Sequence, residues 1–208
     1  MNKRISLIII SLAILAITST VSAADIGIKQ FTDLRMQYVQ RPDFSPLWDM
    51  GESRDTIFSA RYDGKLDEAL ELSGKWLKEH PLDAEVHLLR SFIYRAKNDM
   101  KGYFHHYYIY TGLLASIASS GDGLSMKTAM KVTSVAEEYF IIRALEGQTI
   151  QQSVVSDENG MYDKMDCKID DKEITLYFDI SIPMNAYNRM FQKKEEKEEE
   201  KAEEQNPQ

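Results

Sequence analysis

Apolar side chains recur at helical spacing along the first two thirds of the chain. Phe31, Leu34 and Tyr38 follow an i, i+3, i+7 pattern, and the prolines at 42 and 46 end that segment. The same period predicts helices over about residues 53–62, 66–80, 82–96 and 103–117, and a sixth from about Ser125 to Leu145. The fifth carries a narrow stripe of Tyr103, Tyr107, Tyr110, Leu114 and Ile117, and the sixth is expected to bury Ala129, Val132, Ala136, Tyr139 and Phe140.

The helices between residues 50 and 118 are spaced like a helix–turn–helix repeat. Turn signals at residues 63–64 and 98–99 lie about 35 residues apart, with Pro81 between two helices. Ala69 as a small packing residue and Pro81 as a terminal proline resemble the tetratricopeptide repeat. The bulky Trp76 departs from that pattern. At best two degenerate repeats are therefore expected, packed against the flanking helices.

Beyond Gly147 the pattern changes to that of strands. Residues 150–155, 161–169 and 174–180 are rich in β-branched, aromatic and alternating apolar residues. Asp157-Glu158-Asn159-Gly160 is a strong hairpin turn, and residues 170–172 close the next one. The sequence therefore predicts an α+β fold, in which stacked antiparallel helices resembling degenerate tetratricopeptide repeats precede a three-stranded antiparallel meander. A short last helix is expected after Pro183.

The two ends of the chain differ from the middle. Lys3 and Arg4 precede a short apolar run, and Val21-Ser22-Ala23 has the small-residue pattern of a cleavage site. Residues 193–204 hold 4 Lys and 7 Glu and end in a polar segment. We therefore expect a cleaved signal peptide over residues 1–23, a single domain over residues 24–192 and a charged disordered tail over residues 193–208.

Composition limits the kinds of partner that the protein can bind and the cellular compartment in which it is expected. The 208 residues include 25 Lys and Arg against 33 Asp and Glu, a net charge of −8, which argues against nucleic acid as a partner. A single cysteine, Cys167, excludes a disulfide framework and a cysteine-rich zinc module. No cysteine lies near residue 23, so a bacterial lipid anchor on the mature N-terminus is not expected. We expect a periplasmic or secreted protein with no stable membrane span after signal cleavage.

No standard catalytic motif occurs: the sequence lacks H-E-x-x-H, G-x-S-x-G, a Walker loop and G-x-G-x-x-G. No metal site and no cofactor are predicted. Chemistry-bearing side chains remain as candidates, and each has a structural explanation beside the functional one. Cys167 is expected to be a half-buried strand residue, and His105 to be solvated. The candidate functional residues are His87, Ser120, Asp122, Glu137, Glu138, Asp163 and Asp179.

Two of these candidate groups have competing explanations. The loop Ser120-Gly121-Asp122-Gly123 presents amides that suit an anion, or Gly121 takes a left-handed helix cap and Asp122 or Ser125 caps the next helix. Glu137 and Glu138 point about 100° apart on a helix, so they are no facing acid–base pair. At least one of them borders apolar surface and needs a partner.

Short motifs spread along the chain resemble those of a family of exported bacterial proteins. This family is known chiefly from Bacteroides and relatives and is catalogued as domain-of-unknown-function family 4919. The resemblance covers about residues 28–182 and implies export and overall build, with no activity attached. Its residues are Phe31, Leu34-Arg35, Tyr38, Pro42-Asp43-Phe44, His87, Gly112-Leu113, Ile117, Ser120-Gly121-Asp122-Gly123, Thr128-Ala129, Glu137-Glu138-Tyr139, Asn159-Gly160, Tyr162-Asp163 and Tyr177-Phe178-Asp179-Ile180.

Two functions follow as hypotheses. The first is a non-enzymatic interaction module of the cell envelope with a protein partner, suggested by the helix–turn–helix units, the many aromatic residues and the absence of catalytic motifs. The alternative is a hydrolase or metal-binding protein that uses His87, Asp122 and Glu137 or Glu138. The sequence leaves open whether the protein is an enzyme.

Overall fold

The protein combines a succession of helices with a small sheet, which confirms the expected α+β class. The computed structural model describes residues 23–46 and 52–192; the expected signal peptide up to residue 22 and the charged tail from residue 193 lie outside them. In chain order the elements are α2 (Ala23–Tyr38), α3 (Glu52–Tyr62), α4 (Leu66–Glu79), α5 (Ala84–Ala96), α6 (Met100–Ala118), the 3-10 turn η1 (Met126–Thr128), β1 (Met130–Lys131), α7 (Val135–Ala144), β2 (Gln148–Asp157), β3 (Gly160–Ile169) and β4 (Lys172–Asp179), followed by a helical segment over residues 181–192.

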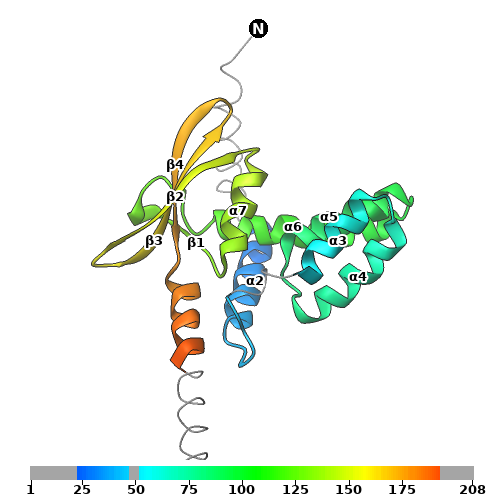
Figure 1. Cartoon of the computed structure of the whole chain (residues 1–208), viewed down its shortest axis with the longest axis horizontal. Helices are drawn as coiled ribbons and strands as arrows, with labels where there is room; N and C mark the ends of the chain where they lie inside the picture. The colour runs from blue at the N-terminus through cyan, green and yellow to red at the C-terminus, as the bar shows by residue number, and fades with distance from the viewer. Residues whose placement is uncertain (1–22, 47–51, 193–208) are drawn as a thin grey trace, which may run out of the picture.

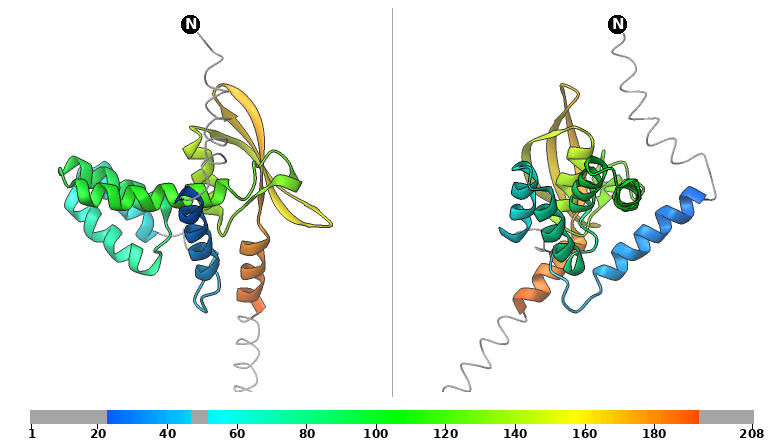
Figure 2. Two further views of the ribbon diagram at one scale, coloured as in Figure 1. Left: turned by 180° about the vertical axis from the view of Figure 1, so that it is seen from behind. Right: turned by 90° about the vertical axis from the view of Figure 1, so that its right-hand side faces the viewer.

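The helices α3, α4 and α5 lie on one side of the molecule and the sheet lies on the other (Figure 1). The long helix α6 runs from the helical stack towards the sheet, and α2 and α7 lie between the two parts (Figures 1 and 2). Consecutive helices from α3 to α6 pack one on the next. The predicted stack of helices is therefore present.

Two aspartates begin the helices α5 and α6. A carboxylate oxygen of Asp83 accepts the backbone N–H of Val86 at 3.1 Å, and one of Asp99 accepts that of Gly102 at 2.9 Å. Each side chain satisfies one of the amide groups that a helix start leaves without an intrahelical partner. Helices α5 and α6 therefore begin at capping residues, as the turns predicted from the sequence require.

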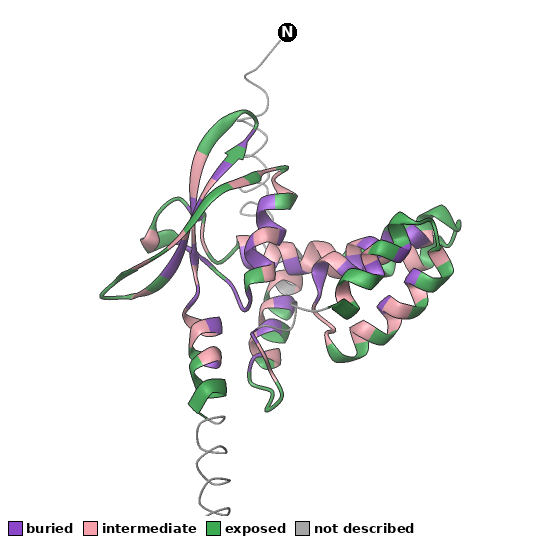
Figure 3. Ribbon diagram, in the orientation of Figure 1, coloured by how far each residue is buried: buried purple, intermediate pink, exposed green. Residues whose placement is uncertain are grey.

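A cluster of buried apolar side chains holds α3, α4 and α5 together. Its fully buried members include Ala69 and Val86, and the outer faces of these helices are exposed (Figure 3). Ala69 has no exposed surface, as expected for the small packing residue of a helix pair. The whole buried set is Ile57, Ala60, Ala69, Val86, Leu89 and Ile93.

The sheet contains the predicted meander and one strand more. Strands β2, β3 and β4 are antiparallel neighbours, and β1 is added parallel to β4, so the strand order among the described residues is β1-β4-β3-β2. Asp170 and Asp171 turn the second hairpin with φ of 49° and 64°, the left-handed backbone that tight hairpins need. The prediction of a purely antiparallel, three-stranded sheet was incomplete, because the two-residue strand β1 has no sequence signal of its own.

The predicted sixth helix from Ser125 to Leu145 was wrong. The 3-10 turn η1 and strand β1 occupy its first part, and helix α7 begins only at Val135. Ser134 is extended, with φ −156° and ψ 164°, and Glu137 three residues later accepts the backbone N–H of Thr133 at 2.7 Å. Ser134 has the position of the N-cap, but its hydroxyl makes no cap hydrogen bond, so the pairing of β1 with β4 accounts for the interrupted helix better than a capping box does.

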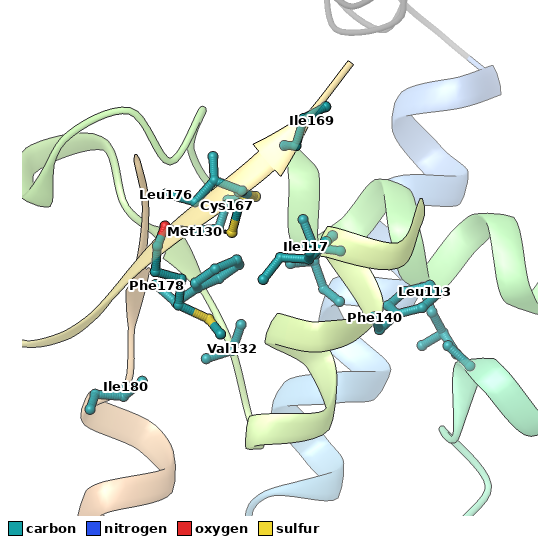
Figure 4. Close-up of a cluster of buried hydrophobic side chains, with 14 of the residues drawn as sticks. Leu113, Ile117, Met130, Val132, Phe140, Cys167, Ile169, Leu176, Phe178 and Ile180 are labelled. Atoms are coloured by element: carbon teal, nitrogen blue, oxygen red, sulfur yellow. Dashed lines mark hydrogen bonds between the residues drawn. The ribbon is translucent and has the colours of Figure 1, made fainter. Parts of the chain in front are cut away.

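The main core lies where α6 and α7 meet the sheet (Figure 4). Ile117 of α6 and Phe140 of α7 face strand residues such as Leu176 and Phe178. Cys167 belongs to the same cluster and is fully buried, which makes it a core residue. Burial raises the pKa of its thiol, so the reactive thiolate is disfavoured.

Helix α6 buries the predicted stripe only in part: Ile117 is buried, and Tyr110 and Leu114 pack, partly buried, against the main core. Its buried residues are His106, Leu113, Ser116 and Ile117, while Tyr107 is 38% exposed. The neighbouring helices α2 and α5 pack against α6 and leave part of its aromatic surface uncovered. That surface contains the candidate site described below.

Gly112 of α6 makes the close approach of α2 possible. A Cβ atom at this position would overlap the ring of the buried Phe31. We therefore expect Gly112→Ala to lower the free energy of unfolding by about 1–3 kcal/mol through overpacking, although alanine is the better helix former. Gly27→Ala in α2 is the control, because a Cβ there meets nothing within 4 Å and should stabilise by about 0.5–1 kcal/mol. Urea denaturation of both variants measures the difference, and equal stabilisation by both would contradict this packing.

Candidate functional site

A surface groove of about 730 Å³ lies between α2 and α6. Phe31 and Leu82 supply apolar surface to it, while Leu34 and Tyr108 are 40% and 57% exposed. Few charged groups reach this groove: the residues around it are Gln30, Phe31, Leu34, Gln37, Tyr38, Arg41, Pro81, Leu82, His105, Tyr108 and Ile109. Exposed apolar surface of this kind is the usual mark of a binding site.

The groove forms because α2 crosses α6 at a glycine. Gly112 lets the ring of Phe31 reach α6, and Phe31 then packs edge-to-face on Tyr108, with ring centroids 5.4 Å apart. No Asp, Glu, Lys or Arg occurs from Tyr103 to Gly121, so the α6 wall carries no formal charge apart from any on its histidines. The result is an apolar cleft with polar tyrosine hydroxyls at its edge.

One end of the groove is polar. The Tyr38 hydroxyl lies 3.4 Å from Nδ1 of His80, and the Arg41 guanidinium lies 5.2 Å from the centre of the Tyr38 ring. Arg41 also makes a bidentate hydrogen bond to Asp43. Burial raises the pKa of Tyr38, and the Arg41 charge works against that rise. Tyr38 and Arg41 also line a second hollow of about 350 Å³ beside the end of α4, so the two hollows adjoin.

Aromatic side chains extend the apolar surface along α6 beyond the groove. Phe104 is 61% exposed, Tyr108 57% and Tyr107 38%. Removing such rings from water is favourable, and aromatic residues are enriched at the cores of protein interfaces. We call Phe104, Tyr107 and Tyr108 the aromatic face of α6.

A buried histidine pair lies between α5 and α6, on another side of α6 from the solvated His105. Nδ1 of His87 is 2.9 Å from Nδ1 of His106, and Nε2 of His87 is 3.0 Å from the carbonyl oxygen of Pro81. Arg90 donates from Nε to Nε2 of His106 at 3.0 Å. His105 is exposed as expected, whereas His87 and His106 are buried.

These contacts determine the protonation of both rings. The Pro81 carbonyl accepts, so His87 carries its proton on Nε2 and accepts at Nδ1. Arg90 donates to Nε2 of His106, so His106 carries its proton on Nδ1 and donates it to His87. Burial, followed by the neighbouring His87, Arg90 and His105, lowers the pKa of His106 to about 3, and burial also lowers the pKa of His87. Both rings are therefore neutral, and all four ring nitrogens have partners.

Arg90 is itself fixed from several sides. It donates to the carbonyl oxygen of Leu70 and to the hydroxyl of Ser73, both at 2.7 Å, and to the hydroxyl of Tyr94 at 2.9 Å. The Tyr94 ring stacks on His106 with centroids 5.5 Å apart. Because the histidine pair and Arg90 join α4, α5 and α6, we interpret the role of His87 as structural.

Glu137 forms an ion pair with a buried arginine that lies 102 residues earlier in the sequence. Arg35 of α2 is 2% exposed and makes a bidentate ion pair with Glu137. The same guanidinium donates to the hydroxyl of Ser116 on α6 at 3.1 Å and to the carbonyl oxygen of Lys131 on β1 at 3.0 Å. Arg35 therefore connects α2, α6, β1 and α7.

A second polar cluster joins the helical stack to α7. Arg54 of α3 donates to the buried Asp83 at 2.8 Å and to Glu85 at 2.7 Å, and Trp76 donates to Asp83 at 2.9 Å. Arg143 of α7 reaches the same Glu85. The carboxylates hold the pKa of Arg54 above its ordinary value despite its burial. We interpret this cluster too as structural, because it holds α3, α4, α5 and α7 together.

The Ser120–Gly123 loop is held by its own residues. The Ser120 hydroxyl accepts the backbone N–H of Lys131 at 2.8 Å. Asp122 accepts from the hydroxyl of Thr128 at 2.6 Å and from the N–H of Leu124 at 2.9 Å, and these bonds lower its pKa. The prediction that Gly121 takes the left-handed conformation was wrong: Gly123 does so, with φ 71°, while a Cβ at Gly121 would overlap backbone carbonyls.

Glu138 of α7 and Asp163 of β3 both act electrostatically on Tyr139. Glu138 is completely buried and Asp163 is 4% exposed. Tyr139 donates to Gln152 at 2.9 Å, and Gln152 donates to Asp163 at 2.7 Å. Burial raises the pKa of Tyr139, and the two carboxylates add to that rise. Asp179 is separate from this group and accepts the backbone N–H of Ser181 at 3.0 Å.

The hydrogen bonds therefore distribute the seven candidates over several places. His87 belongs to the α5–α6 pair, Asp122 to its own loop, and Glu137 to the Arg35 pair, to which Ser120 is linked through Lys131. The arginines that organise these clusters, Arg35, Arg54 and Arg90, were missed by the sequence analysis. The signal was present, because Arg35 follows Phe31 by one helical turn, where an apolar residue is expected.

Within residues 23–46 and 52–192, no group of three or more His, Cys, Asp and Glu side chains is arranged to hold a metal ion. In the same part of the chain no helix has both the length and the apolar character needed to cross a membrane.

A model of the family described as a domain of unknown function (DUF4919) matches residues 22–189. The chain belongs to the DUF4919 family. No curated protein and no solved structure matches the chain. The DUF4919 match extends from α2 into the helical segment after β4, so the helical stack, the groove and the sheet all lie within this one family domain.

Proposed function

We propose that this DUF4919 protein is an exported, non-enzymatic interaction module that binds a protein partner through the groove and the aromatic face of α6. The observation that carries the proposal is the exposure of Phe104, Tyr107 and Tyr108 beside an apolar groove of about 730 Å³. The cores of interfaces are enriched in such aromatic side chains and depleted in Lys, Glu and Asp.

Export is part of the same proposal. A basic start, a short apolar run and a small-residue cleavage pattern ending at Ala23 support a cleaved signal peptide and a periplasmic or secreted location. The helix pairs between α3 and α6, with Ala69 buried and Pro81 between α4 and α5, support a degenerate tetratricopeptide-like repeat as the binding scaffold.

The alternative, a hydrolase or metal-binding protein, has less support. It needs His87, Asp122 and Glu137 or Glu138 in reach of one reacting atom. His87 is instead hydrogen-bonded at both ring nitrogens, Asp122 holds a loop, and Glu137 is paired with Arg35. These side chains serve separate structural contacts.

Site-specific photo-crosslinking tests the proposed binding surface. A photoreactive phenylalanine analogue replaces Phe104 in the full mature chain, and the chain is exposed to native envelope extract. We expect a discrete crosslinked protein at Phe104 that is absent when the analogue replaces Phe92, an equally aromatic and 46% exposed residue on α5. Adding Tyr108→Ala should weaken crosslinking about tenfold, as for an interface anchor. Equal crosslinking from both positions, or none from Phe104, would contradict the proposal.

A further inference from the structure

Strand β2 is a free edge of the sheet. It pairs with β3 on one side, and no other described strand lies on its other side. None of its ten residues is buried, whereas β3 has five buried residues (Figure 3). Alternate backbone N–H and C=O groups of such an edge point outwards and can be paired only by water or by another strand.

The edge lacks most features that prevent strand pairing. From Gln148 to Ser156 there is no Lys, Arg, Asp, Glu or Pro. A bulge between Thr149 and Gln151 is the one protective feature, and it leaves residues 151–157 in regular register with β3. The opposite edge of the sheet is different, because the two-residue β1 is too short to be a template.

Exposed apolar residues accompany this free backbone. Ile150 is 54% exposed and Val154 is 58% exposed. Val154 lies opposite Asp163 in the register with β3, on the side of the sheet where β3 is buried. A strand added beside β2 would cover Val154 and pair the outward backbone groups.

We propose that β2 pairs antiparallel with β2 of a second copy of this chain, which joins two sheets about a two-fold axis. Each chain carries a net charge of −8, so copies repel unless they meet through a neutral surface. About a two-fold axis at Val154, residues 152–156 of one copy lie opposite residues 156–152 of the other, and none of these residues is charged. With the axis at Val154, that residue faces its own copy as a β-branched pair, and Ser153 faces Val155.

Sedimentation of the full mature chain over about a hundredfold range of concentration tests the proposal, because dimer population follows mass action. We expect a monomer–dimer equilibrium. Val154→Lys should raise the dimer dissociation constant at least about tenfold, because two lysines would face each other across the axis. Leu124→Lys is the control: Leu124 is 62% exposed in the loop before β1, and this variant should dimerise as the wild type does.

Mixing Val154→Lys with Val154→Glu gives a second, independent readout. The two variants place opposite charges across the axis, so the mixture should form a heterodimer while each variant alone stays monomeric. Thermal melting checks that both are folded. A wild-type chain that is monomeric at every concentration, or a Val154→Lys chain that dimerises normally, overturns the proposal.

Discussion

Replacing Arg35 by methionine should lower the free energy of unfolding by about 3–5 kcal/mol, because it leaves the Glu137 carboxylate buried without its countercharge. Arg35 is 2% exposed and the side chain of Glu137 is 10% exposed. The substitution also removes the donors to Ser116 and to the Lys131 carbonyl, so α2, α6 and β1 lose their common contact. Urea denaturation at neutral pH measures the change.

Two further variants separate the buried charge from simple loss of contacts. Arg35→Met combined with Glu137→Leu should recover most of the lost stability, since removing both charges avoids an unpaired buried carboxylate. Arg41→Met is the matched control. Its ion pair with Asp43 is exposed, with side-chain exposures of 40% and 66%, so the loss should be below about 1 kcal/mol. A single and a double variant of equal stability would show that the Glu137 charge costs nothing when unpaired.

The same pair shows what the sequence could and could not predict. Helical periodicity, proline breaks and hairpin turns are local signals, each carried by residues close together in the sequence. They predicted the helices α2 to α6 and the strands β2 to β4. Arg35 and Glu137 are 102 residues apart, and nothing local to either residue names the other. The need of a buried carboxylate for a partner was predictable, but the partner was not.

Strand β1 and helix α7 illustrate a second limit. The apolar period runs on through residues 125–145, so it favoured one long helix. The tertiary structure instead pairs Met130 with Phe178, adjacent in space but distant in sequence. Ser134 and Glu137 have S-x-x-E spacing, but the Ser134 hydroxyl makes no cap hydrogen bond, so this local pattern does not explain the helix start.

Several residues that carry the DUF4919 resemblance meet in space. Phe31 packs on the position of Gly112, and Arg35, one turn along α2, binds Glu137. The Ser120 hydroxyl binds the N–H of Lys131, whose carbonyl binds Arg35. These residues explain how α2, α6, α7 and β1 are fixed together. The residues of the family resemblance therefore include those that fix these elements together, and Phe31, Leu34 and Tyr38 among them also line the groove.

The histidine pair makes stability depend on pH. Burial lowers the pKa of His106 to about 3 and also lowers the pKa of His87, while both titrate near pH 6.5 in an unfolded chain. Below about pH 6.5 the unfolded chain binds protons that the folded chain does not. The stability is thus fully present above that pH and is lost as the pH falls, for His106 by about 1.4 kcal/mol per pH unit; His87 adds a loss in the same direction.

For His106 this loss amounts to about 2 kcal/mol between pH 6.5 and pH 5. Urea denaturation at both pH values should show it in the wild type and in His105→Gln, whose exposed ring lies outside the pair. His106→Gln removes the titrating group and should show a smaller loss over the same interval, whatever its stability at pH 7. Arg90, His105 and Asp83 are the charged or titratable groups around the pair. If His106→Gln and the wild type lose equal stability from pH 6.5 to pH 5, His106 is not held neutral by the fold.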